Sequence, residues 1–127
     1  MKSALYNQGL EALSKIHGSH SGETIVRDME KICPDFGRMT IEWAFGEIMT
    51  RPALDLKTRE LVIIASCVTL GHAAPQLEAH IEAALNVGAT KEEIVEVILQ
   101  MAIYAGFAAA TNSFYVLKKV LERMEKA

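Results

Sequence analysis

The sequence predicts an all-α fold of six to seven helices joined by short turns. Half of its 127 residues are hydrophobic but only 6% are aromatic, and alanine is abundant. This mix suits closely packed helices better than a β-sandwich. Apolar residues recur at helical spacing along most of the chain, and no stretch alternates apolar and polar residues for long enough to predict a strand.

The first half of the chain is expected to hold three helices. Apolar positions at helical spacing predict the first over residues 3–16, and a Gly/Ser loop separates it from a short second helix over 23–32. Pro34 starts a third, whose apolar surface is wide enough to be buried on two sides; it carries Phe36, Met39, Ile41, Trp43, Phe45 and Ile48. Pro52 ends it, because the residue before proline is pushed out of the α region.

The second half carries clear helix start and stop signals. Asp55 is a good N-cap for a helix that ends at Gly71, and Pro75 suits the first turn of the next. Thr90 and Glu93 form a capping box. These signals predict helices over 55–70, 75–87, from residue 90 to the interruption at Gly106, and 108–126.

Composition and charge narrow the class of protein. The length predicts a single domain over 1–127 that can bury enough surface to fold without a metal or a disulfide. A net charge of −3 without any basic run argues against nucleic acid as a partner. The amphipathic N-terminus does not have the pattern of a signal peptide. Neither of the two apolar stretches, 61–70 and 94–114, is expected to span a membrane. We therefore expect a cytoplasmic protein without membrane contact, whose Cys33 and Cys67 are free thiols.

Glu60 and His80 are the candidate catalytic residues. One turn beyond Glu60 lie the apolar residues Ile64, Cys67 and Val68. His80 likewise borders an apolar stripe that contains Leu77, Ala83 and Ala84. Because a short connection joins their two helices, these helices should pack as an antiparallel hairpin. A carboxylate and an imidazole facing one partly buried pocket form a plausible proton-transfer set, although contact between them is not required by the spacing.

Simpler interpretations of these residues stay open. A single histidine on an apolar helix face is more often a hydrogen-bonded core or interface residue, and the helix dipole alone favours a glutamate near a helix start. His72 and His80 lack a third ligand at suitable spacing, so no metal site is predicted. Arg51 either holds a carboxylate or caps helix carbonyls. Cys67 has the setting of a small apolar residue.

Several motifs in the same order resemble the carboxymuconolactone decarboxylase family over about the last two-thirds of the chain. They are FGE before the TRPALD turn, the His80 helix ending in AALNVG, the TKEEI capping box and QMAIYAGFAAATN. The resemblance implies an all-α, helical-hairpin fold of the alkylhydroperoxidase D-like type, shared between subunits of a trimer or hexamer.

The resemblance also implies one of two chemistries. One branch decarboxylates γ-carboxymuconolactone to an enol-lactone in aromatic catabolism without a metal or organic cofactor. The other is an antioxidant, peroxiredoxin-like branch that uses a CxxC pair with a Glu–His relay. That pair would fall at His72 and Pro75, neither of which is a thiol. His80 matches the family histidine of both branches.

The first branch is therefore the expected one, with a small carboxylate as substrate. His80 is the expected proton donor or oxyanion partner, and Glu60 orients it or shuttles its proton. Arg51, Tyr104 and Asn112 are candidate substrate-binding residues, although Tyr104 and Asn112 are equally expected as polar groups satisfied within the fold. Two alternatives remain: a peroxidase assistant that uses Cys67 alone, and a non-catalytic oligomeric binding protein. The resemblance also leaves open another small carboxylated or carbonyl compound as substrate.

Overall fold

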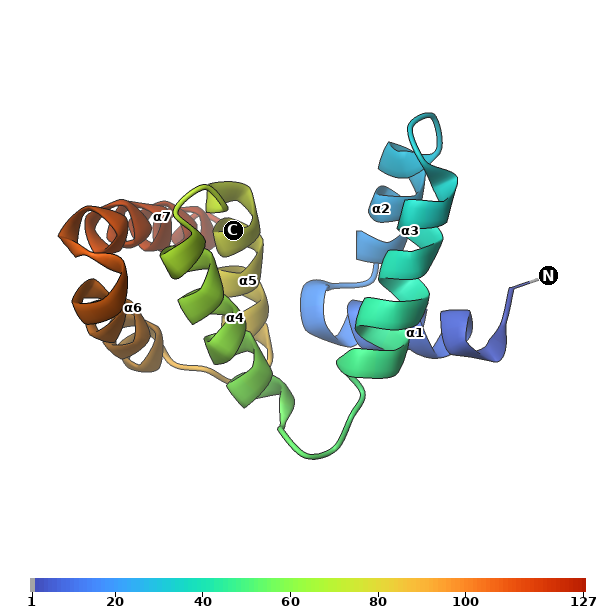
Figure 1. Cartoon of the computed structure of the whole chain (residues 1–127), viewed down its shortest axis with the longest axis horizontal. Helices are drawn as coiled ribbons and strands as arrows, with labels where there is room; N and C mark the ends of the chain where they lie inside the picture. Colours follow the sequence, from blue (N-terminus) through green and yellow to red (C-terminus); the bar gives the residue numbers. More distant parts are fainter. Residues whose placement is uncertain (1) are drawn as a thin grey trace. The chain divides into compact units, whose positions relative to one another are not determined.

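The computed structural model describes residues 2–127, and these are helical with no strand. The elements follow one another along the chain as Figure 1 shows. They are α1 (Ala4–His17), α2 (Ser21–Met29), α3 (Pro34–Met39), η1 (Thr40–Ile48), α4 (Leu56–Leu70), α5 (Ala74–Asn86), α6 (Lys91–Ala105) and α7 (Phe107–Glu125). The predicted all-α class is confirmed.

The chain divides into two compact units, each described by itself below. The N-terminal unit is Met1–Asp55 and the C-terminal unit is Leu56–Ala127. The boundary falls just after the Arg51-Pro52 turn, at the start of α4.

In the N-terminal unit, α1 and η1 pack closely because glycine lies on both sides of the contact. A Cβ added at Gly9 would lie 1.9 Å from the backbone oxygen of Ile41, and one added at Gly46 would lie 2.6 Å from that of Leu5. No side chain fits at either place, so the two helix backbones meet directly. The ring of Phe45 packs edge-on against that of His17 at 5.8 Å between centroids.

The third predicted helix differs from expectation in two ways. It begins at Pro34 as predicted but continues as a π-helix from Thr40, with wider turns than an α-helix. Within this chain it also buries one apolar face rather than two. Ile41, Phe45 and Gly46 are buried, whereas Phe36, Met39 and Trp43 remain exposed. The second group is therefore not buried within the single chain, and its burial between subunits stays a prediction.

The C-terminal unit packs α4, α5, α6 and α7 around one core, seen side by side at the green-to-red end of Figure 1. Its buried side chains come from all four helices and include Ile64, Val68, Leu77, Ile81, Ile94, Ile98, Leu117 and Val120. Adjacent helices α4 and α5 contact each other extensively, as the predicted hairpin requires.

The predicted stop and start signals of this unit are present. Gly71 has a φ of 78° in the turn after α4, a conformation that favours glycine. Pro75 lies in the first turn of α5. Thr90 and Glu93 form both hydrogen bonds of the capping box, at 3.1 and 2.9 Å, so α6 begins where the sequence predicts.

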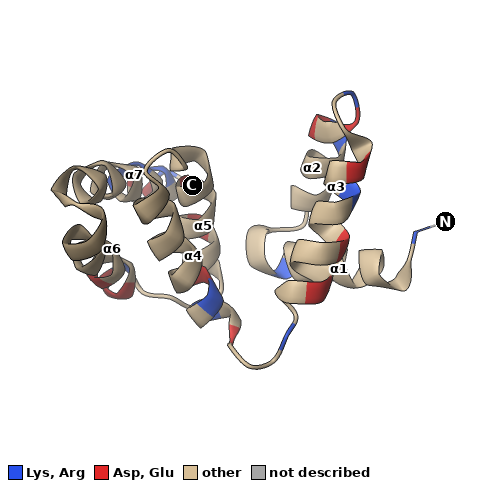
Figure 2. Ribbon diagram, viewed as in Figure 1, with Lys and Arg blue, Asp and Glu red and all other residues tan. Residues whose placement is uncertain are grey.

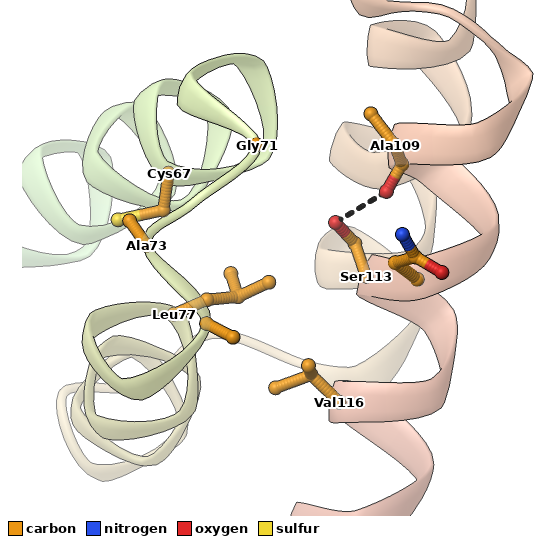
Figure 3. Close-up of a pocket in the computed structure, with 9 residues that line it drawn as sticks. Cys67, Gly71, Ala73, Leu77, Ala109, Ser113 and Val116 are labelled. Carbon is orange, nitrogen blue, oxygen red and sulfur yellow. Dashed lines mark hydrogen bonds between the residues drawn. The ribbon is translucent and has the colours of Figure 1, made fainter.

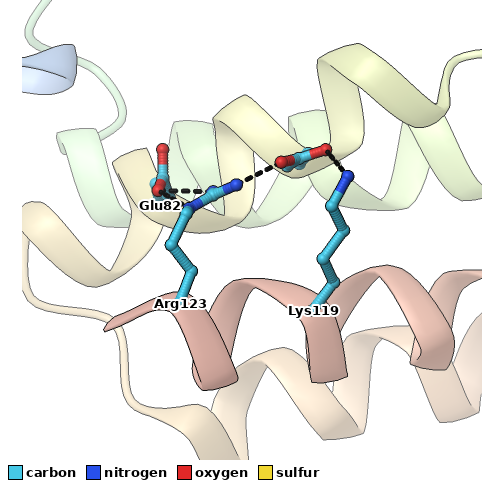
Figure 4. A network of polar contacts seen from close by, with 4 residues as sticks. Glu82, Lys119 and Arg123 are labelled. Atoms are coloured by element: carbon cyan, nitrogen blue, oxygen red, sulfur yellow. Dashed lines mark hydrogen bonds and ion pairs between the residues drawn. The ribbon is translucent and has the colours of Figure 1, made fainter. Parts of the chain in front are cut away.

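Charged residues of both signs are interspersed in each unit (Figure 2). Arg123 and Lys119 on α7 form ion pairs with Glu78 and Glu82 on α5, and these pairs tie the two helices together (Figure 4). Among residues 2–127, no helix combines the length and the apolar character needed to cross a membrane.

Candidate functional site

Glu60 and His80 meet in the C-terminal unit. His80 Nδ1 lies 2.7 Å from Glu60 Oε1, which is hydrogen-bond distance. The Glu60 side chain is completely buried, while 20% of the His80 side chain is exposed. Glu60 is thus shielded from solvent, whereas part of the His80 side chain remains accessible to it. The sequence left this contact open, and the structure shows that it forms within one chain.

The helix faces explain why these two side chains meet. Glu60 lies one turn before the buried Ile64 on α4, and His80 lies one turn after the buried Leu77 on α5. Since α4 and α5 pack on these faces, each polar side chain is directed into the contact between the helices. A carboxylate in this position can fix the orientation and the tautomer of the imidazole.

The second oxygen of Glu60 has an unusual environment. Oε2 is buried and, within residues 2–127, has no hydrogen-bond partner. A buried polar atom without a partner costs stability. Such costs are typical of functional sites rather than of structural cores, because a structural role would be served as well by an apolar side chain.

An open pocket lies in the same unit; its empty space of about 290 Å³ includes open solvent. Figure 3 shows Cys67, Ala73 and Leu77 on one side of it, facing Ser113 and Val116 on α7. We call it the Cys67 pocket. Its complete lining is Cys67, Gly71, Ala73, Ala74, Leu77, Ala109, Asn112, Ser113 and Val116.

The Cys67 pocket and the Glu60–His80 pair share the same helix faces. Cys67 follows Glu60 by seven residues, two turns and ~10 Å along α4, and Leu77 precedes His80 by one turn on α5. The charge of Glu60 acts on the Cys67 thiol in the wall of the pocket. Burial, and then the Glu60 carboxylate, raise the pKa of the Cys67 thiol above its usual value.

The three predicted substrate-binding residues have different surroundings. Asn112 lines the Cys67 pocket. Tyr104 is 79% exposed at the end of α6, so within this chain it is a surface residue. Arg51 belongs to the N-terminal unit, where its backbone N–H donates to the carbonyl oxygen of Ile48 at 3.1 Å. Of the three, Asn112 is the residue that lines the Cys67 pocket.

The pocket itself was not predicted from the sequence. Cys67 was interpreted as a small packing residue, or in one alternative as the thiol of a peroxidase assistant, and Ala109 and Ser113 were not singled out. A signal was present for Cys67, because it lies on the same helix face as Glu60. No comparable signal marks Ala109 or Ser113, which reach the pocket through the packing of α7.

Comparison with known proteins gives one family. The carboxymuconolactone decarboxylase family matches residues 34–119. The chain is 32% identical over 117 residues to the 4-carboxymuconolactone decarboxylase of Acinetobacter baylyi, covering 92% of this chain and 87% of that protein.

Two further relatives are similar over most of the chain. One is the nitrosuccinic acid decarboxylase of Metarhizium robertsii, 29% identical over 121 residues, which cover 94% of this chain and 83% of that protein. The other is an uncharacterized 15.0 kDa protein of Paracoccus denitrificans, 38% identical over 96 residues, which cover 75% and 72% of the two chains. With the helical fold, the motifs and these matches in agreement, the chain belongs to the carboxymuconolactone decarboxylase family.

Proposed function

We propose that this protein is a carboxy-lyase that decarboxylates a small lactone acid such as γ-carboxymuconolactone to an enol-lactone. The observation that carries the proposal is the contact between His80 and the fully buried Glu60, on the two helices that also contribute to a small pocket. Two relatives named as decarboxylases support the class of reaction.

In the proposed reaction, the substrate itself accepts the electron pair, and the protein stabilises the resulting charge and supplies a proton. The bond between the ring carbon and the carboxylate breaks, carbon dioxide leaves, and the electron pair passes into the conjugated lactone carbonyl. The resulting oxyanion must be stabilised, and a proton must be returned to carbon. Because the conjugated carbonyl accepts the electron pair, the proposed reaction requires neither a metal nor an organic cofactor.

His80 is the proposed proton donor or oxyanion partner. Its Nδ1 is engaged with Glu60 Oε1, and Nε2 is the atom proposed to act on the substrate. Glu60 is the proposed positioning residue, which holds the orientation of the His80 ring. Asn112 is the proposed substrate-binding residue in the pocket. Arg51 and Tyr104 stay predictions from the sequence for the same role.

A peroxidase function that uses Cys67 alone is less well supported. A peroxidatic thiol needs a low pKa and access to solvent, because the thiolate is the nucleophile. Cys67 is buried and the pKa of its thiol is raised. Both properties work against thiolate chemistry at this position.

We also propose that several copies of the chain assemble into a trimer or hexamer. Large apolar side chains of the C-terminal unit are exposed around the junction of α6 and α7, namely Leu99, Ile103, Tyr104 and Phe107. Exposed apolar clusters of this kind commonly mark contacts between proteins. Size-exclusion chromatography with light scattering tests this by measuring the molar mass of the assembly. We expect Phe107→Glu to lower the molar mass toward that of the monomer, and Lys118→Glu to leave it unchanged.

The decarboxylase proposal is tested with γ-carboxymuconolactone and the ultraviolet absorbance of the lactone. We expect the wild-type protein to turn it over, and His80→Ala to lose that activity while keeping its helical content. His20→Ala is the matched control, since His20 lies exposed on the N-terminal unit. Full activity in His80→Ala, or no turnover by the wild type at high enzyme concentration, would contradict the proposal.

A further inference from the structure

The Cys67 pocket is open to solvent, and its lining carries no charge. Its walls are mainly small or apolar side chains, and none of its nine lining residues is Lys, Arg, His, Asp or Glu. The pocket therefore suits a compact ligand group that is not ionised.

A carboxylate would be poorly held in this pocket. Burying an ionised group without a partner of opposite charge is costly. The nearby charge is moreover negative, because the carboxylate of Glu60 acts on Cys67. An anionic group is therefore disfavoured twice, first by the lack of a cation in the lining and then by repulsion.

Polar groups of the pocket favour a ligand that accepts a hydrogen bond. The Ser113 hydroxyl donates to the carbonyl oxygen of Ala109 at 2.8 Å, as the dashed line in Figure 3 shows, so its proton is already used. The Asn112 side chain, in contrast, carries an NH₂ group that can donate to a ligand. A carbonyl oxygen is the matching group on the ligand.

We propose that the Cys67 pocket is the subsite for the uncharged lactone ring of the substrate, whose carbonyl oxygen accepts a hydrogen bond from the Asn112 carboxamide while the substrate carboxylate lies outside the pocket. This inference rests on the proposed function, since it assigns the lactone ring of the same substrate to the Cys67 pocket. It makes Asn112 and the pocket walls the residues that select for a ring over an open-chain acid.

The test measures ligand binding without any turnover. In a Cys33→Ser background, Cys67 is the remaining thiol. Its labelling by methyl methanethiosulfonate is followed by intact mass in the presence of γ-valerolactone, a neutral lactone without a reactive double bond. The comparison ligand is 4-hydroxypentanoate, the ring-opened form of the same carbon skeleton, which carries a carboxylate.

We expect γ-valerolactone at millimolar concentration to slow the labelling of Cys67 at least threefold, with saturation, and 4-hydroxypentanoate to leave it unchanged. Asn112→Leu should remove the protection, whereas Lys118→Leu, on the exposed side of α7, should keep it. Circular dichroism checks that both variants are folded.

Equal protection by the two ligands, or no protection by either, would overturn the subsite, and protection that survives Asn112→Leu would overturn the role of Asn112. The proposed decarboxylation can fail separately. Protection by the lactone without turnover of γ-carboxymuconolactone rejects the reaction and keeps the subsite. Turnover without protection keeps the reaction and rejects the subsite.

Discussion

The imidazole of His80 holds one oxygen of a carboxylate, Glu60, whose other oxygen has no partner among residues 2–127. The two side chains lie twenty residues apart in the sequence and 2.7 Å apart in space. A folded protein gains little from such an arrangement, because burying a carboxylate with one unsatisfied oxygen costs free energy. We therefore propose that the pair serves chemistry rather than stability, and this proposal can be tested.

Replacing Glu60 by methionine should separate stability from activity. Methionine has a similar length and no polar atom, so Glu60→Met removes the unsatisfied oxygen and keeps the volume filled. We expect the free energy of unfolding to be unchanged or higher. The rate of decarboxylation should fall at least ~100-fold, since His80 loses the group that orients it. Urea denaturation and the absorbance assay measure the two quantities.

The matched control is Ile64→Ala, one turn along the same buried face of α4. It removes apolar volume and should cost about 2–5 kcal/mol of stability. A loss of similar size in Glu60→Met would show that the carboxylate supports the fold, and the functional interpretation of the pair would then be wrong.

Much of the C-terminal unit was predictable from the sequence because its signals are local. Gly71, Pro75 and the Thr90 capping box each act within a few residues, so they locate helix ends without knowledge of the tertiary structure. Glu60 and His80 were also selected as candidates from local signals, as polar residues on apolar helix faces. Their contact needed only one further step, that helices joined by a short turn pack together.

The Cys67 pocket and the π-helix were not predictable in this way. The pocket forms where Ala109 and Ser113 of α7 come opposite the turn between α4 and α5, about forty residues earlier in the sequence. This placement depends on how four helices pack, which no short pattern encodes. In η1, the apolar spacing of Ile41 and Phe45 predicts a helix but does not distinguish a wider turn from a standard one.

The two cysteines should differ in reactivity. Cys33 is exposed, whereas Cys67 is buried and the pKa of its thiol is raised, first by burial and then by Glu60. Since iodoacetamide reacts with the thiolate, Cys67 should be labelled clearly more slowly than Cys33 at pH 8. Glu60→Gln removes a negative charge and should therefore lower the pKa of Cys67 and speed its labelling.

Peptide mass spectrometry over a series of pH values measures both rates in one sample, and Cys33 is the internal control. Its rate should be the same in both proteins. An unchanged pH profile for Cys67 in Glu60→Gln would mean that the charge of Glu60 does not reach the pocket wall.

The ion pairs between α5 and α7 should give a pH-dependent contribution to stability. Hydrogen bonds from Arg123 and then Lys119 lower the pKa of Glu78 below its ordinary value of 4.5. A carboxyl group with a lowered pKa stabilises the fold above its unfolded pKa, and this stabilisation is lost as the pH falls through the folded pKa. Because the pairs are partly exposed, Glu78→Gln should cost at most about 1 kcal/mol at pH 7.

Thermal unfolding from pH 7 to pH 3 measures this difference. It should be largest at pH 7, should shrink below pH 4.5 and should weaken in high salt, because salt screens exposed charges. Glu96→Gln, an exposed change on α6, provides the comparison. A difference between wild type and Glu78→Gln that stays constant over the whole pH range would argue against the ion pairs as its source.

The close contact between α1 and η1 should make the N-terminal unit sensitive to a single methyl group. In Gly9→Ala the new Cβ would lie 1.9 Å from the backbone oxygen of Ile41. Since that oxygen belongs to a helix backbone rather than to a flexible side chain, the two helices must move apart. Overpacking of this kind costs about 1–3 kcal/mol or more.

We expect a lower melting temperature for Gly9→Ala by circular dichroism, whereas Glu11→Ala, an exposed change on the same helix, should melt like the wild type. If Gly9→Ala also melts like the wild type, the backbones of α1 and η1 do not meet as closely as described.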